Sequence, residues 1–301
     1  MTSVVRLAGL TKDYGHRRAL DRVDLTVEAG EVFGYLGPNG AGKTTTIRLL
    51  LGLLRPTGGR VEVFGFDAWR HSVQIHARTG YVPGDPRWYE RMTGAEIIRY
   101  FAALRRQPDT RLASALAERF DLDLTRPVRA LSRGNKQKLA IVQAFMSRPD
   151  LVVLDEPTSG LDPLVQQQFH RLLREVTARG ATVVLSSHVL AEVQETADRV
   201  GIIRQGRLVA VERLDELRAK ALHRVEAHFA GPVSRDAFAA IGEVRDLRLD
   251  DGVLRCGVPQ RSLDALIKVL ARFAVADVSI TEADLEEMFL TFYAAGDADA
   301  A

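Results

Sequence analysis

A glycine-rich segment near the start of the chain limits the possible folds more than any other feature. Residues 37–45 are Gly-Pro-Asn-Gly-Ala-Gly-Lys-Thr-Thr, which matches the phosphate-loop pattern G-x-x-x-x-G-K-[ST]. Glycines let backbone N–H groups wrap a phosphate without Cβ clashes, and a helix that follows directs its positive end at the same oxygens. A strand is predicted over 31–36 and a helix over 43–54. This context argues against a chance match and favours a phosphate-binding site.

Individual side chains of the loop have defined roles in this chemistry. Lys43 supplies a mobile ammonium for the β- and γ-phosphates, and the Thr44 hydroxyl is a ligand for Mg²⁺. The loop therefore predicts a phosphate-bearing nucleotide together with Mg²⁺. The residues expected to hold the nucleotide are Gly37, Pro38, Asn39, Gly40, Ala41, Gly42, Lys43, Thr44 and Thr45.

A second chemical feature is a strand that ends in two carboxylates. Residues 151–156 are Leu-Val-Val-Leu-Asp-Glu, and ligands of open parallel sheets bind at this end of the strands. Asp155 is expected to hold Mg²⁺. Glu156 points the other way and is expected to orient an attacking water or to accept its proton. A solvated acidic turn is the plain alternative, and the phosphate loop in the same chain weighs against it.

The order of the predicted elements indicates an α/β fold. Short apolar runs at 151–154 and 182–185 enclose a helical pattern, which is typical of a parallel sheet buried on both faces. Residues from about 87 to 147 are mainly helical, with apolar positions three and four apart. Further strands are predicted at 4–10, 20–27 and 60–64, and a hairpin at 200–203 and 208–211.

A smaller unit is predicted after a boundary near 213–221. Strands at 224–229, 244–249, 253–258 and 275–280 alternate with helices at 234–241, 262–273 and 283–293. This βαββαβ order is the split form of the ferredoxin-like fold. We therefore expect a small α+β ferredoxin-like C-terminal domain over 222–294.

Three further segments narrow the phosphate-binding fold to a particular family. Residues 131–135 are Leu-Ser-Arg-Gly-Asn, residues 158–162 are Thr-Ser-Gly-Leu-Asp, and His188 follows an apolar strand. Together with the phosphate loop and the acidic strand, this set resembles the ATP-binding subunit of an ATP-binding-cassette (ABC) transporter over about residues 3–215. The resemblance implies a P-loop NTPase fold of the ABC ATPase type over 1–215, with a mixed sheet and a helical subdomain at about 87–147.

The resemblance also implies a mechanism. The family forms a head-to-tail pair of ATPase subunits, in which the signature motif of one subunit completes the ATP site of the other. Glu156 and His188 would then be catalytic, and Tyr14 would stack on adenine. The residues that resemble the motifs facing ATP across the pair are Ser132, Arg133, Gly134, Asn135 and Asp162.

Two positions depart from the family pattern. In the signature, usually Leu-Ser-Gly-Gly-Gln, Arg133 replaces a glycine and Asn135 replaces the glutamine. In the loop after 80–82, Gly84 takes the place of the glutamine that usually helps to hold Mg²⁺ and couples the ATPase to the membrane partner. Asp85 or water are the expected substitutes for that ligand.

Composition narrows the class of ABC protein. The chain has 301 residues, a single cysteine and a formal net charge of +2, with no apolar run of membrane-spanning length. We expect a protein that is peripheral at the cytoplasmic face of the membrane and works with a separate permease. Residues 284–293 resemble the tail of ATPases of ABC-2-type (daunorubicin-resistance-like) exporters. The alternative is a soluble ABC ATPase acting on nucleic acid or ribosomes, or as a regulatory module. The near-neutral charge gives no expectation of nucleic acid, and Glu156 and His188 favour hydrolysis.

Overall fold

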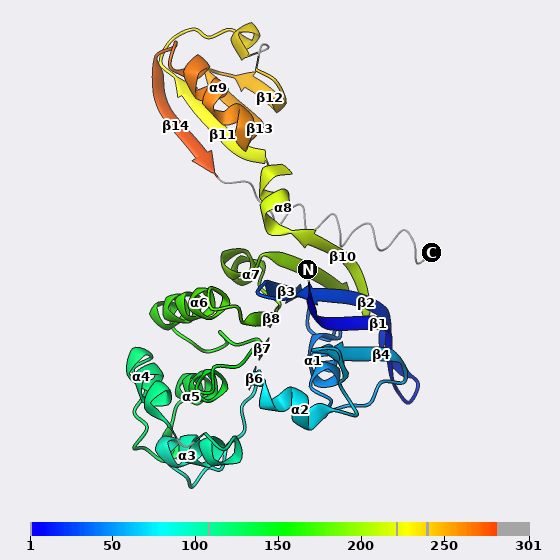
Figure 1. Cartoon of the computed structure of the whole chain (residues 1–301). Helices are drawn as coiled ribbons and strands as arrows, with labels where there is room; N and C mark the ends of the chain where they lie inside the picture. Colours follow the sequence, from blue (N-terminus) through cyan, green and yellow to red (C-terminus); the bar gives the residue numbers. More distant parts are fainter. Residues whose placement is uncertain (1, 108, 221, 239–240, 282–301) are drawn as a thin grey trace. The chain divides into compact units, whose positions relative to one another are not determined.

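The computed structural model describes residues 2–107, 109–220, 222–238 and 241–281. It divides into two compact units, Met1–Val211 and Glu212–Ala301 (Figure 1). In the described residues, we find no helix with the length and apolar character that a bilayer crossing requires.

The first unit is built on a six-stranded sheet with the order β10-β9-β3-β8-β7-β6. Each of the pairs β9–β3, β3–β8, β8–β7 and β7–β6 is parallel, so these strands end at one edge. The strands are β3 (Val32–Leu36), β6 (Thr79–Val82), β7 (Leu151–Asp155), β8 (Thr182–Ser187), β9 (Arg199–Arg204) and β10 (Arg207–Arg213).

Both faces of this sheet are buried, as its continuous apolar strands predict. Along β7, Val152 and Leu154 pack into a core with the helices α3 (Gly94–Leu104), α4 (Arg111–Arg119), α5 (Arg133–Phe145) and α6 (Pro163–Thr177). Leu151 and Val153 pack into a second core with α1 (Lys43–Leu50) and another sheet. The alternation of side chains along a strand therefore serves two cores at once.

The second sheet of this unit is antiparallel, with the order β2-β1-β4-β5. Its strands are β1 (Ser3–Tyr14), β2 (Arg17–Glu28), β4 (Gly58–Val63) and β5 (Phe66–Asp67). The inward residues Leu7, Leu20 and Val61 lie in the same core as Ile47 of α1 (Lys43–Leu50). This core fixes the phosphate loop between the two sheets.

Helix α1 is shorter than the sequence predicts. It ends at Leu50 instead of residue 54, because Gly52 adopts a left-handed backbone with φ of 61°. A Cβ on Gly52 would also overlap the carbonyl oxygen of Ala68. The chain turns here to allow this close backbone approach, which a helical pattern in the sequence does not reveal.

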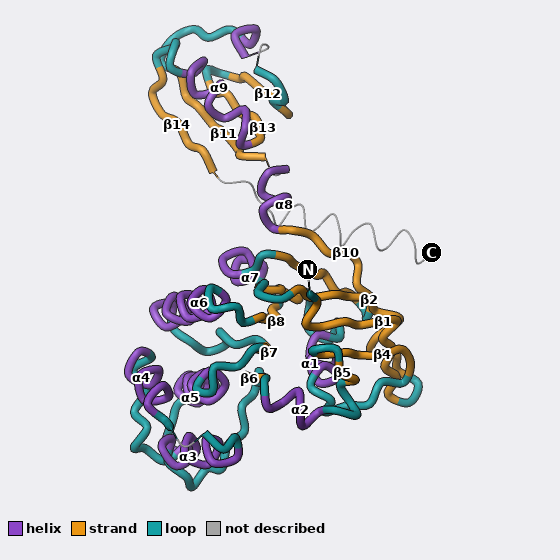
Figure 2. Tube along the Cα trace, in the orientation of Figure 1, coloured by secondary structure: helices purple, strands orange, loops and turns teal. Residues whose placement is uncertain are grey.

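The helices α3, α4 and α5 gather on the β6 side of the sheet (Figure 2). Together with one 3₁₀ turn, Val128–Ala130, they account for the helical pattern predicted over 87–147. Helix α3 begins with a capping box between Thr93 and Glu96. The helices of this unit are α1, α2 (Ser72–Ala77), α3 (Gly94–Leu104), α4 (Arg111–Arg119), α5 (Arg133–Phe145), α6 (Pro163–Thr177) and α7 (Leu190–Thr196).

The second unit contains an antiparallel sheet with the order β12-β13-β11-β14. This is the strand order of a split βαβ fold. Helix α9 packs on the sheet, and the buried Cys256 lies in that core. The elements are α8 (Leu214–Lys220), β11 (Leu222–Phe229), β12 (Arg245–Asp250), β13 (Val253–Pro259), α9 (Gln260–Leu270) and β14 (Val275–Thr281).

One predicted helix of this unit is different in the structure. Of the predicted helix over 234–241, residues 234–238 are described and contain a 3₁₀ turn at Arg235–Phe238, whereas 239–240 lie outside the described residues. The predicted helix 283–293 lies outside the described residues.

Candidate active site

The phosphate loop joins the end of β3 to the start of α1, as predicted. Gly42 is the N-cap of α1 with φ of 116°, and a Cβ there would lie 2.7 Å from Leu20 Cδ2 and 2.9 Å from the carbonyl oxygen of Ala19. A Cβ on Gly37 would overlap the carbonyl oxygen of Ile203. Glycine is needed at these two positions because the neighbouring strands leave no room for a Cβ.

Lys43 is buried inside the loop that carries it. Its side chain is 5% exposed, and Nζ donates to the carbonyl oxygens of Gly37 (2.6 Å) and Pro38 (3.2 Å). The same Nζ lies 3.5 Å from Oε1 of Glu156. Glu156 is thus the counter-charge of the Lys43 ammonium in this structure.

A cavity of about 300 Å³ opens over the loop. Most of the residues that the sequence predicts to bind the nucleotide within one chain line this cavity. Within the loop, the backbone N–H of Ala41 donates to the carbonyl oxygen of Pro38 at 3.2 Å. Two residues that line the cavity, Arg17 and Ala19, were not expected from the sequence. The predicted residues that line it are Tyr14, Asn39, Gly40, Gly42, Lys43, Thr44, Thr45 and Glu156.

Asp155 is the last residue of β7 and is 5% exposed. Its Oδ1 accepts a hydrogen bond from Ser186 Oγ at 2.7 Å. Ser186 is its register partner on β8, so the parallel pairing of the two strands aligns the acceptor and the donor. One carboxylate oxygen is thereby oriented, and the other has no protein donor among the described residues.

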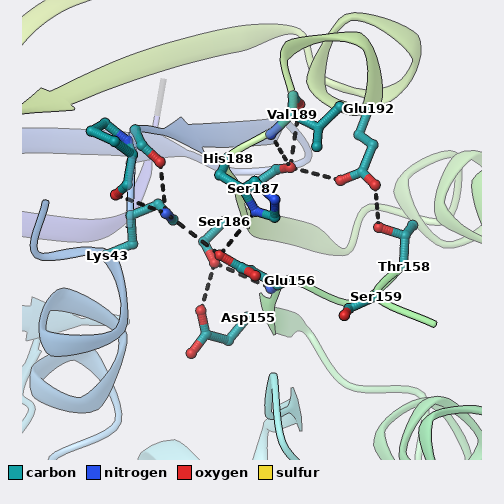
Figure 3. A network of polar contacts seen from close by, with 12 residues as sticks. Lys43, Asp155, Glu156, Thr158, Ser159, Ser186, Ser187, His188, Val189 and Glu192 are labelled. Carbon is teal, nitrogen blue, oxygen red and sulfur yellow. Dashed lines mark hydrogen bonds and ion pairs between the residues drawn. The ribbon is translucent and has the colours of Figure 1, made fainter. Parts of the chain in front are cut away.

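Glu156 turns away from Asp155 because its backbone is left-handed, with φ of 47°. Its backbone N–H is held by the carbonyl oxygen (3.1 Å) and the hydroxyl (3.2 Å) of Ser186. The carboxylate lies between Lys43 and His188, whose Nδ1 is 3.2 Å from Oε1 (Figure 3). A strained backbone of this kind costs of order 1–3 kcal/mol and is held here by β8.

The pKa of the Tyr81 phenol, on β6 beside these strands, is raised by its surroundings. Burial raises the pKa of Tyr81 to about 12, and the negative charge of Asp155 adds to the rise. Tyr81 is therefore a neutral neighbour of the acidic strand end at ordinary pH.

A second network holds the segment that carries His188. The carboxylate of Glu192 accepts hydrogen bonds from Thr158 Oγ1 and Ser187 Oγ, each at 2.6 Å (Figure 3). Ser187 Oγ also accepts from the backbone N–H of Val189 at 2.9 Å. Glu192 therefore ties the chain after β7 to the chain after β8. The sequence reasoning missed Glu192, because no local pattern links residue 192 to residue 158.

The signature residues lie at the start of α5. Ser132 is the N-cap, and its Oγ accepts from the backbone N–H of Asn135 at 3.2 Å. The helix therefore begins at Arg133, inside the signature. Neither these residues nor Asp162 are among the described residues that line the cavity.

The signature contacts the Ser159–Asp162 segment of its own chain. Arg133 Nη2 donates to Ser159 Oγ at 3.0 Å, so its charge is engaged inside the chain. A Cβ on Gly134 would lie 2.7 Å from the carbonyl oxygen of Gly160. Asp162 is the N-cap of α6, and its Oδ1 accepts from the N–H of Val165 at 3.0 Å.

Gly84 lies directly beside the acidic strand end. A Cβ at this position would be 3.2 Å from the carbonyl oxygen of Asp155 and 3.9 Å from its Cγ. The side chain of Asp85 is 84% exposed, and its Oδ2 lies 3.6 Å from Arg87 Nε. The described residues contain no group of three or more His, Cys, Asp and Glu placed to hold a metal.

Comparison with known proteins agrees with this geometry. The model of the ABC transporter family matches residues 20–159. A bacitracin transport ATP-binding protein of Bacillus licheniformis is 35% identical over 223 residues, which cover 73% of each chain. A daunorubicin resistance ATP-binding protein of Streptomyces coeruleorubidus is 33% identical over 300 residues, or 96% of this chain and 95% of that one.

A solved structure described as the ATP-binding subunit of an ABC transporter is also similar. It has a TM-score of 0.68 and 32% identity, and the match covers 72% of this chain and 92% of that chain. The residues matched by the family model include the phosphate loop and the acidic strand end, and the fold is similar to that of the solved structure. The chain belongs to the ATP-binding proteins of ABC transporters, and its activity is ATP hydrolysis.

Proposed function

We propose that this ATPase powers an ABC-2-type exporter through ATP-driven closure of a dimer. The observation that carries the proposal is the cluster of Lys43, Glu156 and His188, in which Lys43 and Glu156 line the loop cavity and His188 contacts Glu156. A cation for phosphate, a carboxylate for water and a histidine beside it are the parts that hydrolysis needs. The similarity to proteins of bacitracin transport and daunorubicin resistance supports export.

In the proposed nucleotide site, Tyr14 stacks on adenine and the loop N–H groups bind the phosphates. Glu156 orients the attacking water, and His188 holds the γ-phosphate and that water. The ammonium of Lys43 then exchanges Glu156 for phosphate oxygens, which frees the carboxylate for the water.

The residues present fit a Mg²⁺ ion. Mg²⁺ in nucleotide sites is usually held by one or two protein oxygens together with phosphates and water, so a cage of carboxylates is not needed. The Thr44 hydroxyl and the second carboxylate oxygen of Asp155 have no hydrogen-bond partner within the described part of the chain, which leaves both free to bind the ion. Bound there, Mg²⁺ would neutralise charge on the phosphates.

We propose that Ser132, Arg133, Gly134, Asn135 and Asp162 act in the ATP site of a second, head-to-tail copy. They lie at helix N-termini, where backbone N–H groups favour anions. Their place outside the lining of the cavity in their own chain supports this role. Because Arg133 and Gly134 contact Ser159 and Gly160, the two segments would move together as the dimer closes.

A second cavity, of about 310 Å³, favours the binding of a membrane partner. It is lined by apolar side chains that include Trp88 and Phe101, and by Pro83 and Pro86 on either side of Gly84. Arg105 also lines it, its Nη1 is buried without a hydrogen-bond partner, and the described residues offer it no carboxylate. We propose that a cytoplasmic segment of the permease, apolar and with one acidic side chain, docks here. Binding would place the ATPase at the inner face of the membrane.

The cavity is connected to both halves of the catalytic machinery. Trp88 Nε1 donates to the carbonyl oxygen of Lys136 on α5, at 3.3 Å. Gly84 lies beside Asp155, where a Cβ built on it would be 3.2 Å from the Asp155 carbonyl oxygen. A segment docked here would therefore act on the signature helix and on the acidic strand end together.

We propose domain bounds of 1–215 for the ATPase, with its helical subdomain at about 87–147, and 222–294 for the small domain.

Co-expression with a membrane protein of about six spans encoded beside this chain tests the proposal. We expect the two to co-purify and the permease to stimulate ATP hydrolysis, with Lys43→Ala removing both the basal and the stimulated rate. Arg105→Glu should abolish co-purification while basal hydrolysis persists, and Arg99→Glu, on the exposed side of the same helix, should not. An active ATPase that neither binds nor responds to that protein would contradict the exporter assignment.

A further inference from the structure

The tip of the hairpin between β1 and β2 carries an arginine that none of the family motifs includes. Tyr14 and Arg17 are register partners on either side of the two-residue turn Gly15-His16. Both line the cavity over the phosphate loop. The aromatic ring and the guanidinium are therefore presented to the same space by one short piece of backbone.

The guanidinium of Arg17 is close to the loop itself. Its Nη2 would lie 3.9 Å from a Cβ built on Gly40, a residue with φ of 81° in the middle of the phosphate loop. The backbone at Gly40 is where the N–H groups turn to face a phosphate. A cation at this distance adds to the positive potential that the loop already presents.

The position of Arg17 on β2 determines which way its side chain points. Arg17 and Ala19 are two residues apart on β2, so they share a face, and both line the cavity. Ala19 and Leu20 press directly on Gly42, which fixes the start of β2 against the loop. Arg18 takes the opposite face and pairs with Asp13 at 2.9 Å and Asp21 at 3.1 Å.

Arg17 differs from that neighbour in having no counter-charge. Among the residues that the structure describes, no carboxylate lies within ion-pair distance of Arg17, and its side chain is exposed to the cavity. A guanidinium is suited to bind phosphate through two parallel N–H donors. We propose that Arg17 binds the phosphate oxygens of the nucleotide, as a positioning residue beyond the loop. This inference rests on the nucleotide site proposed above.

Binding of ADP, AMP and adenosine to the full chain, measured by calorimetry, tests the proposal. A lost hydrogen bond to a charged group should weaken ADP binding about tenfold or more in Arg17→Ala. Adenosine, which has no phosphate, should bind as it does to the parent. Arg17→Lys should recover part of the loss, because it restores the charge without the planar fork. The dependence of ADP binding on salt should become weaker in Arg17→Ala.

Matched variants separate the possible outcomes. Arg18→Ala removes an arginine from the same hairpin but from the face opposite the cavity, and it should leave ADP affinity near the parental value. Equal losses in Arg17→Ala and Arg18→Ala would mean a distorted hairpin and would overturn the proposal. Parental ADP affinity in Arg17→Ala, or an equal loss for adenosine, would overturn it as well.

A further variant distinguishes this inference from the site on which it rests. Lys43→Ala should lose ADP binding whether or not Arg17 takes part. If Lys43→Ala kept its affinity, the proposed nucleotide site itself would be wrong. If only Arg17→Ala kept its affinity, the site would stand and the role of Arg17 alone would be rejected.

Discussion

Nδ1 of His188 lies 3.2 Å from Oε1 of Glu156, although the two residues follow different strands of the sheet. The same Glu156 oxygen lies 3.5 Å from Lys43 Nζ, so one carboxylate joins the phosphate loop to the segment after β8. A phosphate that binds Lys43 would release this carboxylate toward His188 and water. In the proposed site, nucleotide binding at Lys43 would therefore also position Glu156 and His188.

Replacement of Glu156 by glutamine should separate binding from hydrolysis. Glutamine keeps the size of the side chain but cannot accept the proton of water, so steady-state phosphate release should fall at least about 100-fold. ATP should still bind, and an ATP-dependent dimer should accumulate in size-exclusion chromatography. Glu118→Gln, on the exposed face of α4, is the control and should hydrolyse at the parental rate. Parental hydrolysis in Glu156→Gln would remove Glu156 from its catalytic role.

His188→Ala should lower kcat while KM changes little. In the proposed site the imidazole would contact the γ-phosphate and the attacking water in the transition state, and a hydrogen bond to a charged group corresponds to roughly 10- to 100-fold in rate. His228→Ala is a matched control, because His228 also lies beside a glutamate, 3.1 Å from Glu226, but in the second unit. A rise in KM with kcat unchanged would show that His188 only binds nucleotide.

Gly134→Ala should destabilise the protein even though alanine is the better helix former by about 1 kcal/mol. Its Cβ would lie 2.7 Å from the carbonyl oxygen of Gly160, so the segment after β7 must shift. We expect the free energy of unfolding to fall by about 1–3 kcal/mol, measured by urea denaturation, with a loss of hydrolysis. Gly231→Ala has no atom within 4 Å of the new Cβ and should be neutral. A more stable Gly134→Ala would show that the close contact is absent in solution.

The stabilising effect of Asp21 should depend on pH. Hydrogen bonds and charge from Arg207, 2.7 Å away, hold the pKa of the Asp21 carboxyl below its usual range. A depressed pKa stabilises the fold above the ordinary aspartate pKa of about 4, and that contribution is lost as pH falls through the lowered value. The melting temperature of Asp21→Asn should thus lie below that of the parent at neutral pH and approach it in acid.

Asp277→Asn serves as the control for this pH series, because Asp277 lies on the exposed strand β14 without an ion pair among the described residues. Its melting curve should follow the parental curve at every pH. A gap between Asp21→Asn and the parent that stays constant down to pH 2 would contradict the assigned role of the ion pair.

Several features of this protein were determined by the sequence alone. The phosphate loop, the acidic end of β7 and the order of strands and helices are local patterns, because spacing and residue type fix backbone conformation over a few residues. These patterns alone predict that Lys43, Asp155 and Glu156 lie in one site. The apolar runs at β7 and β8 likewise predicted a sheet that is buried on both faces.

Only the tertiary structure decided which distant residues meet. Arg17 reaches the loop because β2 packs on Gly42, and Glu192 joins Thr158 to Ser187 because β7 and β8 are neighbours in the sheet. The early end of α1 at Leu50 likewise depends on Ala68, sixteen residues beyond Gly52 in the chain. Such contacts follow from the strand order and the packing of layers, which join segments that no local pattern relates.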